Sequence, residues 1–343
     1  MCCLFLAMRH YQVSLMYKEK LTVKETQKAI KILKDTFEMV FSNEFNLDRV
    51  SAPIMMNVAD ELNDDLGIKE KAVNFNVKSS NLNIEIVQSL AKWKRVKLKE
   101  YGYYVGEGIY ADMNAIRPND EITQIHSLYV DQWDWELIIE KWDRNLFFLK
   151  NVVKRIVDCL IKVEEILLGK YPQFSSKFSE KVYFVSAKEL YELYPHLDEK
   201  GREDAIVRDK KVVFISGIGD EIAPGVFHGQ RAFDYDDWQL NGDLLVWSDT
   251  LQQAVEITSM GIRVDDKALA NQMLKVKYDK EPSKYHQQIL NNKLPLTIGG
   301  GIGQSRICML LLDKMHIAEV QASVWDEKTL EFFTKNDIKP LYV

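Results

Sequence analysis

The sequence predicts an α+β fold in which an antiparallel sheet is flanked by helices. Short apolar or alternating segments, which are typical of strands, recur along the chain, and several are placed to pair as hairpins. Longer amphipathic segments with helical spacing lie between them. Strands joined as hairpins form antiparallel sheets, whereas a regular alternation of strand and helix would predict a parallel one.

The composition is that of a globular protein with a large core. Of the 343 residues, 46% are hydrophobic and 28% are charged, which is close to the averages for folded domains. With only 16 glycines and 8 prolines, collagen-like and low-complexity structures are excluded. We see no Ser/Gly/Pro-rich linker, so we expect an N-terminal extension over 1–22 and a single catalytic domain over 23–343.

The net charge and the cysteines indicate which partners and which cellular compartment to expect. The 45 Lys and Arg residues against 51 Asp and Glu give a net charge of −6, which argues against a nucleic-acid-coating protein. No stretch approaches the roughly 20 apolar residues of a membrane span. The four cysteines, at positions 2, 3, 159 and 308, form no CxxC pair and are typical of reduced, buried thiols. We therefore expect a cytoplasmic protein without nucleic-acid or membrane partners.

The first half of the chain opens with a helix and continues mainly as strands. Apolar residues at helical spacing predict the opening helix, and alternation with a polar turn predicts the hairpin that follows it. The expected elements are a helix over 24–41, a strand over 47–56 beside Pro53, a hairpin of strands over 73–77 and 83–87, a helix over 90–98 and a central aromatic strand over 126–137.

The second half begins with a long amphipathic segment and returns to strands. That segment should end near Gly169 and Pro172, which are typical of helix ends. The expected elements are a helix over 136–169, strands over 181–186, 211–219, 243–248 and 254–264, two polar helices, and a strand, glycine turn and apolar helix over 296–312.

The common sequence motifs of nucleotide-binding proteins and hydrolases do not indicate a function for this chain. GxxxxGK[ST], GxSxG and HExxH do not occur, and the six histidines do not pair at metal-ligand spacing. GEGIYA at 106–111 matches the dinucleotide-binding pattern, but no clear parallel strand precedes it. A chance match is the better interpretation.

The strand expected over 126–137 has a polar face opposite an aromatic one. Alternate side chains share a face of a strand, so Gln132, Asp134 and Glu136 point to the same side. Arg117 ends the strand before it. Burying charge is costly unless the charge is paired or binds a ligand, which favours a lined cleft over a packed core. A solvated outer face of the sheet is the alternative.

Two further segments carry charge among apolar residues. Asp243, Glu256 and Ser259 supply the oxygen atoms that Mg²⁺ prefers, although a few charges on edge strands would explain the pattern equally well. In the glycine turn before the last apolar helix, backbone amides can approach an anion closely. Arg306 lies in the first turn of that helix, where a cation opposes the helix dipole, so we expect a phosphate rather than a structural contact to hold it. The alternative is a surface arginine.

These segments, in this order, resemble the three motifs of class II aminoacyl-tRNA synthetase catalytic cores. RVSAPIM at 49–55 resembles the first motif, Arg117 with the following strand the second, and GGGIGQSRICMLL at 299–311 the third. YVDQWDWE at 129–136 and GGGIGQSR at 299–306 are similar to the ammonia-dependent asparagine synthetases, a family related to the aspartyl- and asparaginyl-tRNA synthetase cores. The resemblance covers roughly residues 23 to 325.

The resemblance implies an ATP-dependent, AMP-forming ligase with a class II synthetase-like sheet. In this family the side-chain carboxylate of aspartate attacks the α-phosphate of ATP and releases pyrophosphate. Ammonia then attacks the β-aspartyl-adenylate and gives asparagine and AMP. ATP is therefore a substrate, Mg²⁺ is the expected cofactor, and the first motif predicts a homodimer formed through the strand around Pro53.

The resemblance also implies roles for the residues at the nucleotide end. Arg117 would clamp the α-phosphate, and Arg306 would bind the far end of ATP and stack on its adenine. Asp243 and Glu256 would hold Mg²⁺, with Ser259 beside them.

At the amino-acid end, the expected residues anchor or orient aspartate. Lys94 and Arg263 would anchor its carboxylate and the phosphate, while Lys92, two residues away on the same helix, should face solvent. The residues expected to orient aspartate or to accept a proton from the incoming ammonium are Gln132, Asp134, Asp234 and Asp64. The tryptophans at 93, 133 and 135 are better interpreted as core residues.

Two other functions remain open at the level of sequence. An aspartyl or asparaginyl ligase that acts on tRNA would need a tRNA-reading module before the core, and the helix expected from Lys24 leaves no room for one. A non-catalytic, synthetase-like regulatory protein would be expected to lack ATP-binding arginines or metal carboxylates. Arg117, Arg306, Glu256 and Asp243 are all present, so this reading ranks last.

Overall fold

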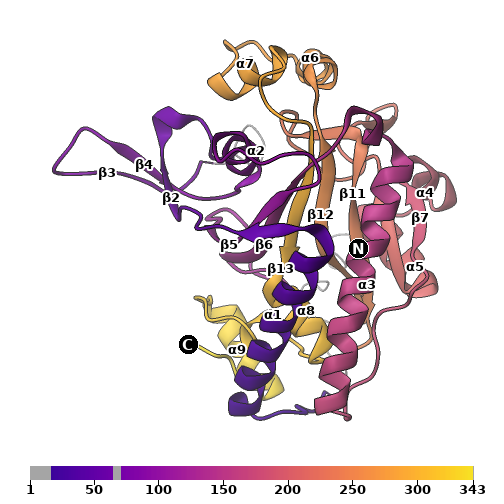
Figure 1. The fold of residues 1–343 in the computed structure, drawn as a ribbon. Helices are drawn as coiled ribbons and strands as arrows, with labels where there is room; N and C mark the ends of the chain where they lie inside the picture. Colours follow the sequence, from indigo (N-terminus) through magenta and orange to yellow (C-terminus); the bar gives the residue numbers. More distant parts are fainter. Residues whose placement is uncertain (1–16, 65–70, 343) are drawn as a thin grey trace, which may run out of the picture.

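The computed structural model describes residues 17–64 and 71–342, and its centre is a twisted eight-stranded sheet (Figure 1). Its inner neighbours pair antiparallel, and only the two edge pairs, β1 with β5 and β7 with β8, are parallel. The predicted antiparallel sheet is confirmed for the interior. The strand order is β1 (Leu47–Arg49), β5 (Gly108–Ile116), β6 (Tyr129–Ile138), β13 (Thr297–Gly303), β12 (Gln253–Arg263), β11 (Asp236–Ser248), β8 (Val212–Ser216) and β7 (Tyr183–Ser186).

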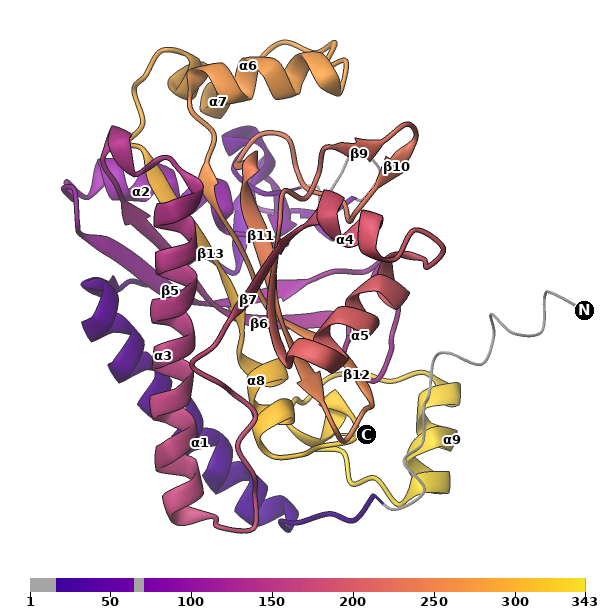
Figure 2. The same ribbon diagram turned by 90° about the vertical axis from the view of Figure 1, so that its right-hand side faces the viewer.

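Helices cover both faces of this sheet. Figure 2 shows α1 (Val23–Phe45) and α3 (Leu146–Lys170) along one side, with α4 (Ala187–Leu193) and α5 (Glu199–Lys210) along the other. The main core cluster lies between the sheet and the first pair, and α8 (Gln304–Leu311) adds to it. α2 (Ala91–Glu100) packs on β6 from the face opposite α1.

The opening helix shows why the sequence folds this way. Thr22 caps α1 in a capping box with Glu25, which satisfies backbone donors at the helix start. A buried stripe that includes Phe37 and Phe41 then faces the sheet, where the ring of Phe37 stacks on Trp133 with centroids 4.2 Å apart. The tryptophans at 93, 133 and 135 are all buried, as predicted.

The remaining elements lie around the sheet. A small three-stranded sheet projects from the main body in Figure 1 and includes the predicted hairpin. It consists of β2 (Met55–Asn57), β4 (Asn83–Ile86) and β3 (Asn74–Asn76). The others are β9 (Glu221–Ala223), β10 (Val226–Phe227), α6 (Asp266–Lys275), α7 (Lys284–Leu290), α9 (Glu327–Asn336) and the short 3₁₀ turns Val58–Asp60, Lys141–Asp143 and Ile317–Glu319.

Three predicted element boundaries are wrong. The strand expected over 47–56 is two strands, β1 and β2, which belong to different sheets. The helix expected from residue 136 begins at Leu146, because residues 136–138 complete β6. The glycine turn expected within 296–312 is the strand β13, and none of its glycines has a positive φ.

The GEGIYA segment at 106–111, which matches the dinucleotide-binding pattern, leads into a strand and not into a helix. β5 begins at Gly108 and pairs antiparallel with β6, so this glycine pattern does not form a dinucleotide-binding turn.

The described part of the N-terminal segment packs on the C-terminal part of the chain. Tyr17 donates a hydrogen bond of 2.6 Å to Glu319, and Leu21 is buried. Cys159 and Cys308 are free and buried, as predicted, while Cys2 and Cys3 lie outside the described residues. Within the described ranges, no helix is long and apolar enough to cross a membrane.

Candidate functional site

A cavity of about 1300 Å³ opens on the sheet face opposite α1. Gln132 and Asp134 of β6 line it, while the alternate side chains of Trp133 and Trp135 pack against α1 on the other face. The cavity brings together six of the predicted site residues: Arg117, Gln132, Asp134, Glu256, Ser259 and Arg263. Five others are not among the residues that line it: Asp64, Lys94, Asp234, Asp243 and Arg306.

The position of the strands excludes the simpler explanations of the charge pattern. β6, β11 and β12 all lie in the interior of the sheet, so their charged residues are not edge-strand charges. Asp134 and Glu136 are buried, so the polar face of β6 is not a solvated outer face. The cleft predicted from the alternation in β6 is confirmed.

The glycines of β13 make room for the polar floor of the cavity. A Cβ atom on Gly299 would lie 2.1 Å from Oε2 of Glu136, and one on Gly301 would lie 2.2 Å from Oε1 of Gln132. Real Cβ atoms do not approach other atoms so closely, so only glycine lets these two side chains lie across the neighbouring strand. The glycine run therefore shapes the floor of a site instead of forming a turn.

Lys94 supports this floor from below. Its ammonium contacts the Asp134 carboxylate, lies 3.7 Å from Oε2 of Glu136 and donates 2.9 Å to the carbonyl of Trp135. Burial is the main cause that lowers its pKa, to about 7, against the nearby charge of Glu136. Lys94 therefore holds Asp134 in place from a position outside the cavity.

The expectation that Lys92 faces solvent is wrong. Its side chain is buried, and its Nζ lies 2.6 Å from Oδ2 of Asp234. His286 Nε2 lies 3.0 Å from the same oxygen. Burial alone would raise the pKa of Asp234, but Lys92 and His286 together lower it to about 2. Lys92 and Lys94 of α2 are thus fixed by carboxylates far away in the sequence.

Arg263 is a fixed positive charge in the cavity wall. Its Nε and Nη2 donate to the Glu136 carboxylate at 3.0 and 2.8 Å, and its Nη1 contacts Asp236. Thr297 adds a hydrogen bond of 2.7 Å to Glu136. Because these carboxylates orient the guanidinium, its charge faces the cavity in one fixed geometry.

At the other end of the cavity, two carboxylates lie near one guanidinium. Arg231 Nη2 donates 2.6 Å to Oδ1 of Asp243, and Nη1 contacts the hydroxyl of Ser259. Burial, opposed by Arg231 and reinforced by the charge of Glu256, raises the pKa of Asp243 to about 6. Two neighbouring carboxylates, one of which raises the pKa of the other, form a donor set that fits a divalent cation.

Arg117 and Arg306 come together from distant parts of the chain. Burial raises the pKa of Asp120, and the charges of both arginines act on that carboxyl in the opposite direction. Arg306 donates to the carbonyl and to Oε1 of Glu256 at 3.1 and 3.2 Å. Its side chain is one-fifth exposed, so it is not a free surface arginine. From the sequence we expected a phosphate in place of a structural contact, and the structure shows a protein partner, Glu256.

Asp64 reaches the cavity through Tyr235. Tyr235 lines the cavity, and burial, the charge of Asp64 and a hydrogen bond to Asp64 all raise the pKa of Tyr235. The backbone carbonyl of Asp64 accepts a hydrogen bond of 2.8 Å from Gln88, whose own carbonyl faces Arg117 at 3.3 Å. This chain of contacts links Tyr235 and Asp64 to Arg117.

Sequence reasoning missed the residues that hold the site together. Arg231, Tyr235 and Asp236 line the cavity, but no role was expected for them. The segment RAFDYDDW at 231–238 could have indicated these residues, because four of its eight residues are charged and it lies between apolar segments. What could not be seen was which of these charges would meet partners on β6 and β12.

The sequence is similar to proteins named aspartate–ammonia ligase. The family model described as aspartate-ammonia ligase matches residues 24–337. A protein of that name from Clostridium perfringens strain 13 is 49% identical over 325 residues, which cover 94% of this chain and 96% of the relative. Another, from Bacillus mycoides, is 48% identical over 324 residues, or 94% and 99% of the two chains.

Solved structures share the fold at low identity. The asparaginyl-tRNA synthetase of Entamoeba histolytica, in complex with asparaginyl-adenylate, matches with a TM-score of 0.65 and 11% identity, over 87% of this chain and 66% of that one. The asparaginyl-tRNA synthetase of Pyrococcus horikoshii, also with asparaginyl-adenylate, has a TM-score of 0.63 and 16% identity, over 87% and 68%. The class II synthetase-like fold predicted from the motifs is confirmed.

Proposed function

The chain belongs to the aspartate–ammonia ligase family, and from this premise we propose how its cavity makes asparagine from aspartate, ATP and ammonia. The reaction passes through a β-aspartyl-adenylate and releases AMP and pyrophosphate. One observation carries the assignment of the site: six residues expected for it from sequence line the same cavity on one face of the sheet.

The reaction needs activation because a carboxylate is a poor electrophile. A carboxylate oxygen of aspartate forms a bond to the α-phosphorus of ATP, and pyrophosphate leaves. Ammonia then bonds to the activated carbonyl carbon, the bond from that carbon to the AMP oxygen breaks, and one proton is released. Such chemistry depends mainly on positioning and on neutralising developing charge.

At the nucleotide end, Arg117 and Arg306 neutralise phosphate charge. A planar guanidinium can donate two parallel hydrogen bonds to a phosphate, which suits Arg117 for the α-phosphate. Arg306 binds the far end of ATP, and its contact with Glu256 orients it. This arrangement is supported by the positive charges of both arginines, which act on the same carboxyl group, that of Asp120.

Asp243 and Glu256 are the residues that would hold Mg²⁺. Their fit rests on the raised pKa of Asp243, to which the neighbouring Glu256 contributes, and on their oxygen donors. When bound, the ion would neutralise charge on the phosphates. Ser259 and Arg231, which contact one another beside Asp243, keep this side of the cavity polar.

At the amino-acid end, the floor of the cavity binds aspartate. Asp134 accepts the ammonium group of the substrate, and Gln132 and Arg263 bind its carboxylates. Lys94 positions Asp134 from below, and Asp234, through Lys92, positions the helix that carries both lysines.

Asp64 accepts the proton that ammonium loses. Its support is its contact with Tyr235 in the cavity wall and its burial, since it is 2% exposed. Asp64 does not line the cavity itself, so it would act as a general base through the bridging hydroxyl of Tyr235.

We also propose the assembly and the compartment. Ile54, Met55, Phe75 and Leu82 are exposed apolar side chains on or beside the small projecting sheet next to Pro53, which supports a homodimer through this region. The main sheet takes strands from residues 47 to 303, which supports one catalytic domain over 23–343. The free, buried thiols of Cys159 and Cys308 favour the cytoplasm.

One assay tests the function against its alternatives. The purified chain is incubated with aspartate, ATP, Mg²⁺ and ammonium, with and without tRNA, and asparagine and AMP are measured. We expect both products in equal amounts without tRNA. Charging of tRNA would instead indicate a tRNA ligase, and no turnover in either case would indicate a non-catalytic protein.

A further inference from the structure

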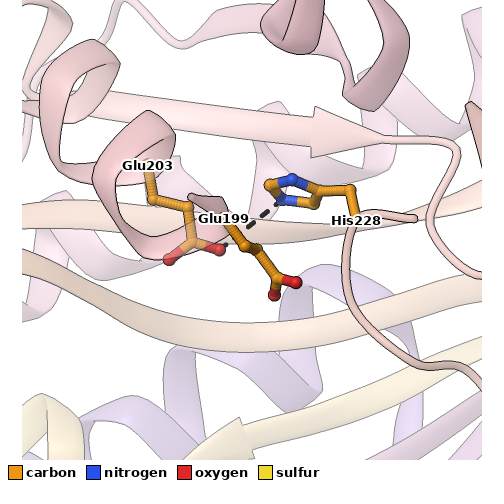
Figure 3. A group of neighbouring side chains, drawn as sticks. All are labelled: Glu199, Glu203 and His228. Carbon is orange, nitrogen blue, oxygen red and sulfur yellow. Dashed lines mark ion pairs between the residues drawn. The ribbon is translucent and has the colours of Figure 1, made fainter. Parts of the chain in front are cut away.

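A second group of potential metal ligands lies outside the residues assigned to the reaction. Glu199 and Glu203 are four residues apart on α5, so both project from the same side of the helix. His228 follows β10 and meets them from the facing segment, as Figure 3 shows. One potential ligand atom from each of the three residues lies within 4.8 Å of the other two.

The histidine provides the observation that points to a ligand. His228 is only 2% exposed, and its imidazole, whose Nε2 faces the carboxylates, makes no hydrogen bond in the described part of the chain. Its Nε2 faces Oε1 of Glu203 at 3.6 Å, which is too long for a hydrogen bond. Burying a polar group without a partner is costly, and an imidazole at this distance from a carboxylate leaves space for an ion between them.

Both carboxylates are oriented by contacts outside the group. Oε2 of Glu199 accepts a hydrogen bond of 2.9 Å from the amide of Gly229. Oε2 of Glu203 faces Lys200 at 3.5 Å, while that ammonium donates 2.7 Å to the carbonyl of Ala254. Such outer contacts fix the direction of ligand oxygens, as they do in metal sites.

We propose that Glu199, Glu203 and His228 bind one divalent transition-metal ion. One imidazole nitrogen and two carboxylate oxygens suit Zn²⁺, Co²⁺ or Mn²⁺, and water would complete the coordination. Mg²⁺ is disfavoured, because it prefers oxygen ligands throughout. This site is distinct from the pair Asp243 and Glu256.

Such an ion would join α5 to a wall of the cavity. Gly229, Gln230 and Arg231 follow His228 directly, and all three line the cavity. The bound ion therefore fixes the segment that presents Arg231 to Asp243. This is a structural role, and it stands whether or not the proposed ligase chemistry is correct.

The test measures binding and not turnover. The metal-free full-length chain, without ATP, is titrated with Zn²⁺ by calorimetry and with Co²⁺ by visible absorption. We expect one high-affinity site per chain. His228→Asn and Glu203→Gln should each weaken binding at least about tenfold, a loss of the size seen when metal-site contacts are removed.

Matched variants locate the site. His196→Asn changes an exposed histidine just before α5 and should bind the ion like the wild type. Asp243→Asn removes a charge that interacts with Glu203 but no proposed ligand, so it should change this affinity much less than Glu203→Gln does. Glu199 is exposed, so Glu199→Gln tests the site even if replacing the buried histidine disturbs folding, which circular dichroism would reveal.

Two results would overturn the proposal. Binding weaker than about 1 mM in the wild type would mean that the three side chains form only a polar contact between α5 and the cavity wall. Binding that is lost in Asp243→Asn but kept in Glu199→Gln would place the ion at the other carboxylates.

Discussion

Arg117 and Arg306, 189 positions apart in a chain of 343 residues, act on the same carboxyl group of Asp120. Within the described ranges, neither arginine forms a buried salt bridge. The side chain of Arg117 donates only to the carbonyl of Gln88, and Arg306 contacts Glu256 at 3.2 Å. Arginines held in this way keep donors available for a phosphate.

We expect Arg117→Ala or Arg306→Ala to lose adenylate formation while keeping the fold. Each removes a donor that stabilises phosphate charge, so aspartate-dependent exchange of pyrophosphate into ATP should fall at least about 100-fold. Arg208→Ala, which removes an exposed arginine stacked on Trp247, is the matched control. Exchange at the wild-type rate in either site variant would contradict the assignment.

The buried pair of Asp234 and Lys92 should make stability depend on pH. The pKa of Asp234 is about 2 in the folded chain against 3.8 unfolded, so the unfolded chain takes up the proton first as the pH falls. The stabilisation, about 2 kcal/mol, is therefore complete above about pH 5 and is lost as the pH falls from about 4 toward 2.

Urea unfolding at several values between pH 5 and pH 3 measures this loss. Asp234→Asn removes the titrating group, so its free energy of unfolding should fall less steeply than that of the wild type over this range, although it starts lower because Lys92 is left buried and unpaired. Asp35→Asn, which changes an exposed carboxylate on α1, should follow the wild-type slope. Equal slopes for Asp234→Asn and the wild type would refute the explanation.

At the level of single residues, local properties could be predicted from the sequence, but long-range pairings could not. The two faces of β6 were predictable because alternation is a local property of the strand. The burial of Lys92 was not, because Asp234, which pairs with it, lies 142 positions further along the chain. Arg231 was missed for the same reason, since its partners Asp243 and Ser259 meet it only after the strands pair.

Among the elements, β13 was the hardest to predict and is central to the site. Four of its seven residues are glycines, which lack the β-branched and aromatic side chains typical of strands. The sequence therefore predicts a turn. In the folded chain β13 is held between β6 and β12, and the missing side chains make room for Glu136 and Gln132.

Gly301→Ala tests this role of β13. The new methyl group would collide with the amide of Gln132, so we expect a higher KM for aspartate with a smaller change in the KM for ATP. Gly169→Ala is the matched control, because nothing lies within 4 Å of a Cβ at this helical position and alanine favours a helix. Unchanged steady-state kinetics in Gly301→Ala would show that Gln132 does not contact aspartate.

The whole molecule was predictable mainly through its motifs. Composition and periodicity gave an α+β chain with an antiparallel sheet, and the resemblance placed the three motifs on one fold. The parallel edge pairs, with β1 on β5 and β7 on β8, were not foreseen, because an edge strand carries no local signal for its direction.

We expect the chain to form a homodimer through the region of Pro53. Light scattering at micromolar concentration should give twice the mass of the chain. Ile54→Asp and Phe75→Asp place a charge on exposed apolar positions of this region and should shift the mass toward the monomer, whereas Phe147→Asp, at an exposed position on α3, should not. A wild-type protein of monomeric mass would contradict the prediction.

The ladder between β6 and β13 joins residues 132–138 to residues 297–303. During synthesis, β6 emerges from the ribosome long before its central neighbour exists, and β12 also waits for that strand. Contacts so far apart in sequence are slow to form, and unpaired strand edges invite association with other chains. The nascent protein should therefore remain dependent on chaperones until β13 is made, and a chain that lacks β13 should be aggregation-prone instead of partly active.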